Sequence, residues 1–323
     1  NLPVSKYYLE LPPATMDDNA SDLFRLRYGL QKNSNLENWP VDFTAVRKLP
    51  AALREKDWKV TATALLDPEI ADDKGINSCR IINVEPGDTR GSLYALAIDV
   101  GTTTVCAQLL DLNRGNILAE TINFNRQISY GSDVISRIAH CQQSDGLPKL
   151  QEMVVASINE AIDNLLGQSR IERNSISYIT VAGNTTMEHL LLGLDPKYIR
   201  LAPYTPVANV FPMVKAQTLG IEVAEHVYVY CFPAVSSYVG GDIVSGVIAA
   251  GIYQNDKLTF YMDIGTNGEI VIGNSDWMVS TSCSAGPAFE GGGIKHGMVA
   301  MSGAIQDFSI DPVTLEPSIK TIQ

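Results

Sequence analysis

The 323-residue sequence predicts an α/β protein in which one strand-loop-strand unit is used twice, with a small α+β region ahead of the first copy. Two observations predict this fold class. The pattern Asp-Val/Ile-Gly-Thr occurs at residues 99–102, within DVGTTT, and again at residues 263–266, within DIGTNGE. Each copy closes a run of strand-forming residues and is followed by another such run, so strand, tight turn and strand are written twice.

Residues 1–92 are expected to form a linker plus a small α+β domain. Strands are predicted at 7–11, 58–66 and 80–84, the second with alternating character, and helices at 22–30 and 43–54, the second interrupted by Pro50. Pro-Gly-Asp at 86–88 and Arg-Gly-Ser at 90–92 mark its end. The segment carries no recognisable catalytic constellation.

Residues 93–250 are expected to form the first half of the duplicated fold, and residues 251–323 the start of an incomplete second half. Three consecutive strands (93–100, 103–110, 117–123) are followed by helices at 133–142 and 150–166, a strand at 177–181, a helix at 187–192 and a strand at 227–232. Thr185 and Glu188 fit a capping box, and Gly193 fits a helix stop. A helix at 241–250 then leads into the second copy.

The two loops have the chemistry of a phosphate site. A Gly-Thr turn directs successive backbone N–H groups and hydroxyls to one point, and the preceding Asp can hold a hydrated Mg²⁺. Asp99 and Asp263 are therefore the candidate catalytic and metal-holding carboxylates. Facing copies would grip a nucleotide triphosphate from both sides through Gly101, Thr102, Thr103 and Thr104 of the first loop and Gly265, Thr266, Asn267 and Gly268 of the second.

A site for phosphoryl transfer to water also needs a polar group that orients the water. Asp242, at the start of the predicted helix 241–250, is the first candidate. Asn184, at the tip of the strand that ends near residue 182, is the second, although it fits a helix-cap role equally well.

Two other interpretations of the repeated motif stay open. The loops can be ordinary hairpins whose Asp satisfies local backbone groups. Two carboxylates can also form an aspartic-protease dyad. Those dyads resemble Asp-Thr-Gly or Asp-Ser-Gly, whereas here an aliphatic residue separates Asp from Gly.

Composition limits the classes of partner. The formal net charge is −12 and no Lys/Arg cluster interrupts it, so we expect no nucleic-acid or anionic-membrane partner. No apolar stretch reaches about 18 residues and no signal-peptide pattern opens the chain, so a cytoplasmic location is expected. Five scattered cysteines without C-x-x-C spacing predict reduced thiols, and no iron–sulfur or zinc site within this chain.

Five stretches together carry a resemblance to known proteins: ALAIDVGTTTV, VAGNTTMEHLLLG, FPAVSSYVGGDIVSG, DIGTNGEIVIG and CSAGPAFEGGGIKHGM, between residues 95 and 298. The two phosphate loops resemble those of the actin, heat-shock-chaperone and sugar-kinase superfamily. The set as a whole is similar to the reductive activators of corrinoid proteins. This resemblance implies an actin-like (ribonuclease H-like) duplicated ATPase fold.

The same resemblance implies ATP-dependent reductive activation of the corrinoid protein of a methyltransferase system, with ATP hydrolysis coupled to the reduction of Co(II) to Co(I) in cobalamin during anaerobic metabolism. ATP and Mg²⁺ would be ligands, and a corrinoid protein the partner. In the full-length protein an N-terminal domain with a 2Fe-2S cluster would receive electrons from a donor. We expect this chain to lack that domain and to stop before its second half is complete. A homodimer is compatible with the sequence.

Two points stay open. Alignment on Pro233 puts Phe232 where the chaperone ATPases have a carboxylate, so the residue that positions the water remains undecided between Asp242 and Asn184. The alternative function is a small-molecule kinase of the acetate or sugar type, which would use the same loops but would also need an acceptor pocket and a base.

Overall fold

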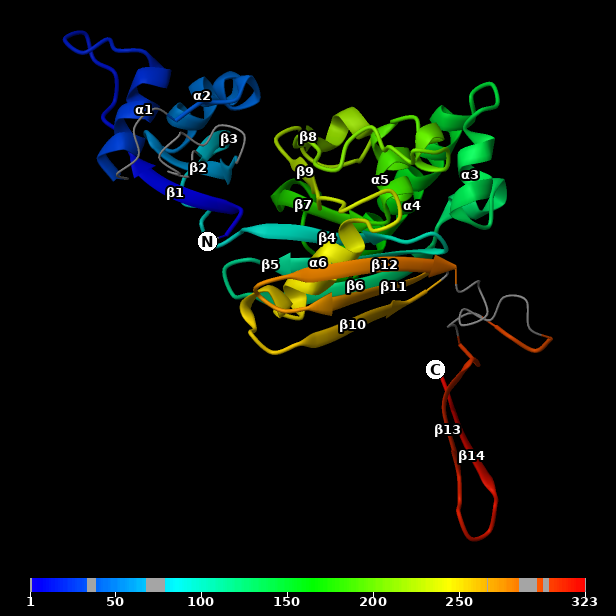
Figure 1. Cartoon of the computed structure of the whole chain (residues 1–323). Helices are drawn as coiled ribbons and strands as arrows, with labels where there is room; N and C mark the ends of the chain where they lie inside the picture. The colour runs from blue at the N-terminus through cyan, green and yellow to red at the C-terminus, as the bar shows by residue number, and fades with distance from the viewer. Residues whose placement is uncertain are drawn as a thin grey trace.

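The computed structural model describes residues 2–33, 39–67, 79–265, 267–284, 295–298 and 302–322. Figure 1 shows a small N-terminal unit beside a larger sheet, with a further sheet and a projecting hairpin formed by the C-terminal residues. Strands and helices mix in both main units, so the predicted α/β class is confirmed.

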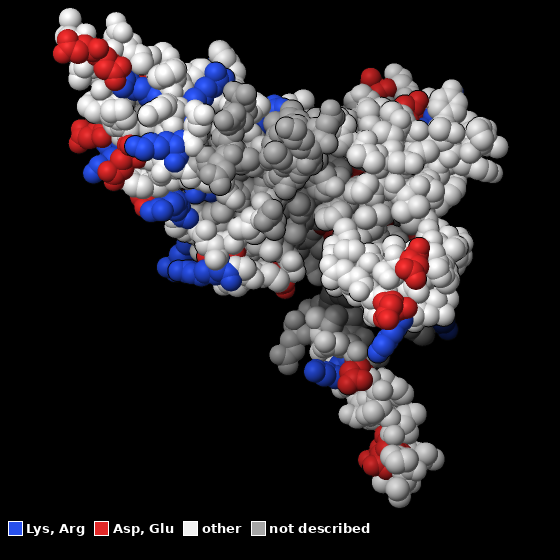
Figure 2. Space-filling view, turned by 60° about the vertical axis from the view of Figure 1, so that its left-hand side comes forward, with Lys and Arg blue, Asp and Glu red and all other residues white. Residues whose placement is uncertain are grey.

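The described part of residues 2–92, here called the N-terminal module, is a three-stranded antiparallel sheet with two helices. Its elements are β1 (Val4–Glu10), α1 (Asp22–Asn33), α2 (Phe43–Glu55), β2 (Lys59–Leu66) and β3 (Cys79–Pro86), in the sheet order β1-β2-β3. Leucines of α1 and α2, such as Leu26 and Leu53, pack with Val60 and Ile81 of the sheet to form its core. In the face seen in Figure 2, basic and acidic side chains are interspersed over this module.

The strand predicted at residues 58–66 is confirmed as β2, although burial does not alternate along it, because a second cluster covers its other face, where Leu65 packs with Leu93 and Tyr178 of the next unit. One expectation for this module is wrong. Helix α2 is not interrupted at Pro50. A proline removes one backbone hydrogen bond, but Leu49 and Leu53 on either side of it are fully buried, and this packing holds the helix together across it.

The larger unit is a six-stranded sheet in the order β6-β5-β4-β7-β9-β8, in which β4, β7 and β9 run parallel. Its elements are β4 (Tyr94–Val100), β5 (Thr104–Asp111), β6 (Asn116–Phe124), α3 (Val134–His140), α4 (Gly146–Ser169), β7 (Ile176–Gly183), α5 (Thr185–Leu192), β8 (Val214–Lys215) and β9 (Tyr228–Cys231). Short 3₁₀ helices lie at Arg126–Tyr130, Arg173–Ser175, Lys197–Ile199, Ala216–Leu219 and Ile252–Gln254.

Strand β4 presents two different faces. Leu96, Ile98 and Val100 are buried in the main core together with the apolar side chains of α4. Because successive strand residues point to opposite faces, Asp99 is directed away from α4. The first motif therefore ends a central strand with its carboxylate on the open side of the sheet.

Helix α6 (Gly241–Ala249) connects this unit to a second antiparallel sheet of β10 (Thr259–Ile264), β11 (Asn267–Gly273) and β12 (Met278–Ser284). On one side α6 contacts β7, and on the other Ile243 packs with Val271 of β11. The hairpin of β13 (Ile305–Ile310) and β14 (Pro317–Thr321) projects away from both sheets (Figure 1). Among the described residues, no helix combines the length and apolar character needed to cross a membrane.

Asp42 joins the N-terminal module to the larger unit. Its carboxylate accepts hydrogen bonds from Lys215 at 2.6 Å and from the hydroxyl of Tyr228 at 2.8 Å. Arg80 of the module approaches the same carboxylate at 3.4 Å. Although Asp42 precedes helix α2, its side chain makes no cap hydrogen bond, because it is committed to this junction.

Candidate active site

Both motifs line one small polar cavity of about 160 Å³. Of the residues singled out from the sequence, it is lined by Asp99, Gly101, Thr102, Thr103, Thr104, Asn184, Asp242, Asp263, Gly265 and Asn267. Gly268 does not line it, and Thr266 lies outside the described residues. Chain segments from both halves and from the connecting helix therefore meet at this cavity.

The first loop is a tight turn whose backbone carbonyl groups accept hydrogen bonds from residues outside the loop. A Cβ atom on Gly101 would lie 2.8 Å from the carbonyl oxygen of Thr104, so only glycine fits. The side-chain amide of Asn125 donates to the Gly101 carbonyl at 2.8 Å, and the Asn125 backbone N–H donates to the carbonyl of Thr103, also at 2.8 Å. The guanidinium of Arg137 donates to the carbonyl of Thr102 at 2.5 Å. These contacts fix the carbonyls of the loop, and its residues Gly101 to Thr104 line the cavity.

The second loop is the turn of the β10–β11 hairpin. Asp263 pairs across the hairpin with Glu269, and the backbone N–H of Gly265 donates to the carbonyl of Asn267 at 3.0 Å. Side chains that directly oppose each other share a face of the sheet, so Glu269 joins Asp263 in the cavity. Gly268 pairs with Ile264, one register position away.

Asn184 caps helix α5. Its side-chain oxygen accepts the N–H of Met187 at 3.0 Å, and its amide donates to the Thr102 hydroxyl at 3.1 Å. The predicted capping box of Thr185 and Glu188 is therefore wrong by one position, because Asn184 supplies the cap and the Thr185 hydroxyl donates to Ser236 instead. The predicted stop at Gly193 is confirmed.

Asp242 lies in the first turn of α6, where the chain packs very closely on the turn between β7 and α5. A Cβ atom on Gly240 would lie 2.4 Å from the Gly183 carbonyl oxygen, and one on Gly241 would lie 2.4 Å from a carboxyl oxygen of Glu188. The paired glycines therefore bring the helix start, and with it Asp242, down to the cavity. With Asn184 engaged in two hydrogen bonds, Asp242 is the better placed of the two candidates for orienting water.

Mutual repulsion and burial dominate the electrostatics of the cavity. Burial of the carboxyl group, followed by the charges of Asp242 and Asp263, raises the pKa of Asp99. Because part of this residue is exposed to solvent, screening reduces the effect. Burial raises the pKa of Asp242 to about 6. Burial also raises the pKa of Glu269 to about 7, although a hydrogen bond from Ser282 acts in the opposite direction. The pKa of Asp263 is raised by burial as well. Perturbed carboxylates in a cleft are typical of catalytic sites.

Three supporting residues were not foreseen. Glu269 belongs to the DIGTNGE motif, and its place opposite Asp263 across a tight hairpin turn could have indicated it. Asn125 and Arg137 carry no sequence signal, because their contacts to the first loop depend on how β6 and α3 fold back onto it.

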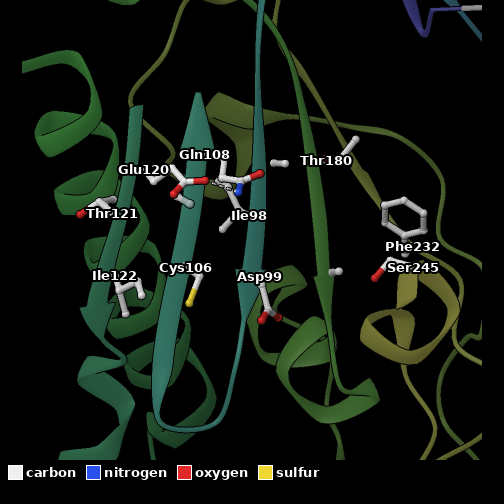
Figure 3. Close-up of a pocket in the computed structure, with 13 residues that line it drawn as sticks. Ile98, Asp99, Cys106, Gln108, Glu120, Thr121, Ile122, Thr180, Phe232 and Ser245 are labelled. Atoms are coloured by element: carbon white, nitrogen blue, oxygen red, sulfur yellow. Dashed lines mark hydrogen bonds between the residues drawn. The ribbon is translucent and has the colours of Figure 1, made fainter. Parts of the chain in front are cut away.

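A larger cavity of about 400 Å³ adjoins the site on the open face of the sheet. Figure 3 shows Asp99 at its margin, with Cys106 on β5, Phe232 and Ser245 around it and a hydrogen bond of 2.7 Å between Gln108 and Glu120. None of the described residues of the second loop lines this cavity. The smaller cavity, which both loops line, is therefore the candidate site.

A hydrated cation fits the smaller cavity. Asp99, Asp242, Asp263 and Glu269 bring negative charge to it, and the described residues that line it include no Lys or Arg. In the described part of the chain, no three His, Cys, Asp or Glu side chains converge closely enough to bind a metal directly. The arrangement thus suits Mg²⁺ held through its waters, since this ion dehydrates reluctantly.

Comparison with known proteins gives three consecutive family matches. Residues 1–91 match the RACo linker region, residues 94–255 the RACo middle region, and residues 257–323 the C-terminal domain of RACo, the ASKHA domain. A solved structure of a reductive activator for corrinoid, iron-sulfur protein superposes with a TM-score of 0.89 at 43% identity, over 99% of this chain and 50% of that chain. This superposition confirms the predicted actin-like ATPase fold.

Two curated relatives are also similar. The corrinoid activation enzyme RamQ of Eubacterium limosum is 32% identical over 233 residues, which are 72% of this chain and 39% of that protein. A reductase of the Co(II) methylated amine-specific corrinoid protein of Methanosarcina barkeri is 25% identical over 222 residues, 67% of this chain and 40% of that protein. The chain thus spans less than half the length of these curated relatives.

Proposed function

The chain belongs to the RACo family, and from this premise we propose that the whole protein is an ATP-dependent reductive activator of the corrinoid protein of a methyltransferase system. The named activities of its relatives support the proposal. The observation that carries the ATP-dependent part is the single cavity lined by both Asp-Val/Ile-Gly-Thr loops.

In this proposal the cavity hydrolyses ATP. Thr102, Thr103 and Thr104 bind one side of the triphosphate, and Gly265 and Asn267 the other. A hydrated Mg²⁺ would offset phosphate charge there, with Asp99 and Asp263 accepting hydrogen bonds from its waters. Asp242 accepts a hydrogen bond from the attacking water. That water forms a bond to the γ-phosphorus as the bond to the bridging oxygen breaks, giving ADP and phosphate and releasing a proton.

The redox step is separate. One electron passes from a low-potential donor to the cobalt of the corrinoid partner, taking Co(II) to Co(I). In the whole protein we propose a 2Fe-2S domain, itself supplied by an external donor, as that source. In this proposal ATP hydrolysis acts on how the corrinoid partner is held, and the five cysteines of this chain stay free thiols. Helix α6 lies between the two sheets and is positioned to transmit closure of the cavity.

The test uses the whole protein, its corrinoid partner and a chemical reductant. We expect Co(I) to appear in the absorption spectrum with ATP and to stay near background with a non-hydrolysable analogue. ATP should also change the affinity for the corrinoid partner by roughly fivefold or more, the lower end of ordinary coupling energies. If no corrinoid protein binds in any nucleotide state while a sugar or carboxylate is phosphorylated, the kinase alternative replaces this proposal.

A further inference from the structure

Glu188 is a fully buried carboxyl group, and neither of its oxygens has a hydrogen-bond partner among the described residues. The adjacent His189 is equally buried, but its Nδ1 contacts the Thr185 carbonyl at 2.6 Å and its Nε2 accepts the N–H of Val207 at 3.1 Å. A buried carboxylate without a hydrogen-bond partner destabilises the folded state, so the presence of Glu188 at this position needs a specific explanation.

The position of Glu188 supplies one. One of its carboxyl oxygens packs against Gly241, the residue immediately before Asp242, so closely that a Cβ atom on that glycine would lie 2.4 Å away. Glu188 therefore packs directly against the first turn of α6. It does not line the cavity itself.

The groups that face Glu188 favour its uncharged form. Burial, and then the charge of Asp242 on α6, raises the pKa of Glu188 to about 9. From β9, Tyr230 and Cys231 also lie near it: burial is the main cause of their raised pKa values, and a charge on Glu188 would raise them further. The pKa of Asp242 is about 6, so near neutral pH the two neighbours divide into a neutral acid and a carboxylate. Such a division between adjacent carboxyl groups typically assigns different roles to them.

We propose that Glu188 is a positioning residue of the ATPase site: as an uncharged carboxylic acid beneath α6, it holds Asp242 in place as the carboxylate that orients the attacking water. This inference rests on the proposed function. It adds a residue that never touches the nucleotide, and it makes the charge state of a buried group a condition for turnover.

The first test needs no activity. The infrared spectrum of the 323-residue chain, minus that of Glu188→Gln, should show the carbonyl band of a protonated carboxylic acid at pH 7, and this band should disappear above about pH 10. Glu152→Gln, which changes a glutamate on the exposed side of α4, should remove no such band. Absence of the band in the unsubstituted chain overturns the inference, whatever the ATPase assays give.

The second test measures ATP turnover by the whole protein against pH. Turnover should rise above about pH 6 and fall above about pH 9. Glu188→Gln should stay within threefold of the unsubstituted rate at pH 7 and lose the alkaline fall. Glu188→Leu, similar in size but without the carboxyl oxygen that packs against Gly241, should lower kcat at least tenfold while changing KM for ATP less than twofold. Unsubstituted kcat in Glu188→Leu, or an alkaline fall retained in Glu188→Gln, overturns the inference. An inactive unsubstituted protein instead overturns the proposed function, and this role with it.

Discussion

The guanidinium of Arg137 donates a hydrogen bond to the backbone carbonyl of Thr102 from a fully buried position beneath the first phosphate loop. The same group donates to the Gly131 carbonyl at 2.9 Å and to the side-chain oxygen of Gln127 at 3.1 Å. Burial lowers its pKa to about 10, so it remains charged at neutral pH. A buried cation thus shapes the loop while lying outside the cavity that the loop lines.

We expect Arg137→Met to lower the free energy of unfolding by about 2–4 kcal/mol, because it leaves buried carbonyl groups without donors. ATP turnover of the whole protein should fall at the same time, since the loop loses its support. Urea unfolding and a phosphate-release assay measure the two effects. Arg114→Met, at a largely exposed side chain, serves as the control. Unchanged stability would show that water replaces the guanidinium without cost.

The proposed metal-holding role of Asp263 gives a second prediction. Asp263→Asn should reduce ATP turnover of the whole protein at least about a hundredfold, because it removes a charge worth several kcal/mol of transition-state stabilisation. Asp276→Asn, in the exposed turn between β11 and β12, should leave turnover unchanged. Turnover of Asp263→Asn within threefold of the unsubstituted rate would contradict the assignment.

The close packing of α6 is tested by a pair of glycine substitutions. Gly240→Ala should destabilise the chain strongly and lower ATP turnover, since the new Cβ atom would lie 2.4 Å from a backbone carbonyl that cannot move aside easily. Gly167→Ala, inside helix α4 where the new methyl group would meet nothing within 4 Å beyond the neighbouring backbone of its own helix, should instead stabilise by up to about 1 kcal/mol. Thermal unfolding of both variants decides the matter, and equal melting temperatures would contradict the packing argument.

The next prediction concerns the attachment of the N-terminal module to the larger unit through Asp42. Asp42→Ala leaves Lys215 and Tyr228 without their shared acceptor, and hydrogen exchange in β1–β3 should accelerate relative to that in β4–β7. Asp17→Ala, at an exposed loop position of the same module, provides the comparison. Identical exchange in the two variants would show that the apolar contacts between the units suffice by themselves.

Features that depend on a few consecutive residues could be predicted from the sequence. Asp99 and Asp263 were identifiable because a tight turn and the strand before it lie within a few consecutive residues, and the repeat raised the specificity of a short motif. Arg137 and Glu188 could not be identified, because their roles depend on segments that are distant in sequence and meet only in the folded chain. The helix cap was misplaced by one residue because Asn184 and Thr185 are both good cap residues, and only the contact with Ser236 distinguishes them.

The last prediction concerns the pH dependence of stability. The pKa of Glu188 rises from its ordinary value of 4.5 to about 9 on folding, so the folded chain holds a proton that the unfolded chain releases. Its contribution to the free energy of unfolding is therefore complete below about pH 4.5 and lost as the pH rises towards 9. The slope is at most about 1.4 kcal/mol per pH unit.

Comparison with Glu188→Gln separates the contribution of Glu188 to the free energy of unfolding from that of other groups. One such group is the buried His226, whose lowered pKa decreases stability as the pH falls. Between pH 6 and pH 8, urea unfolding of the unsubstituted chain should lose more free energy than that of Glu188→Gln, by up to about 2.7 kcal/mol. Glu152→Gln should follow the unsubstituted curve, because that side chain is exposed. Parallel curves for the unsubstituted chain and Glu188→Gln would mean that Glu188 is charged in the folded state, and that an undescribed cation or water cluster satisfies it.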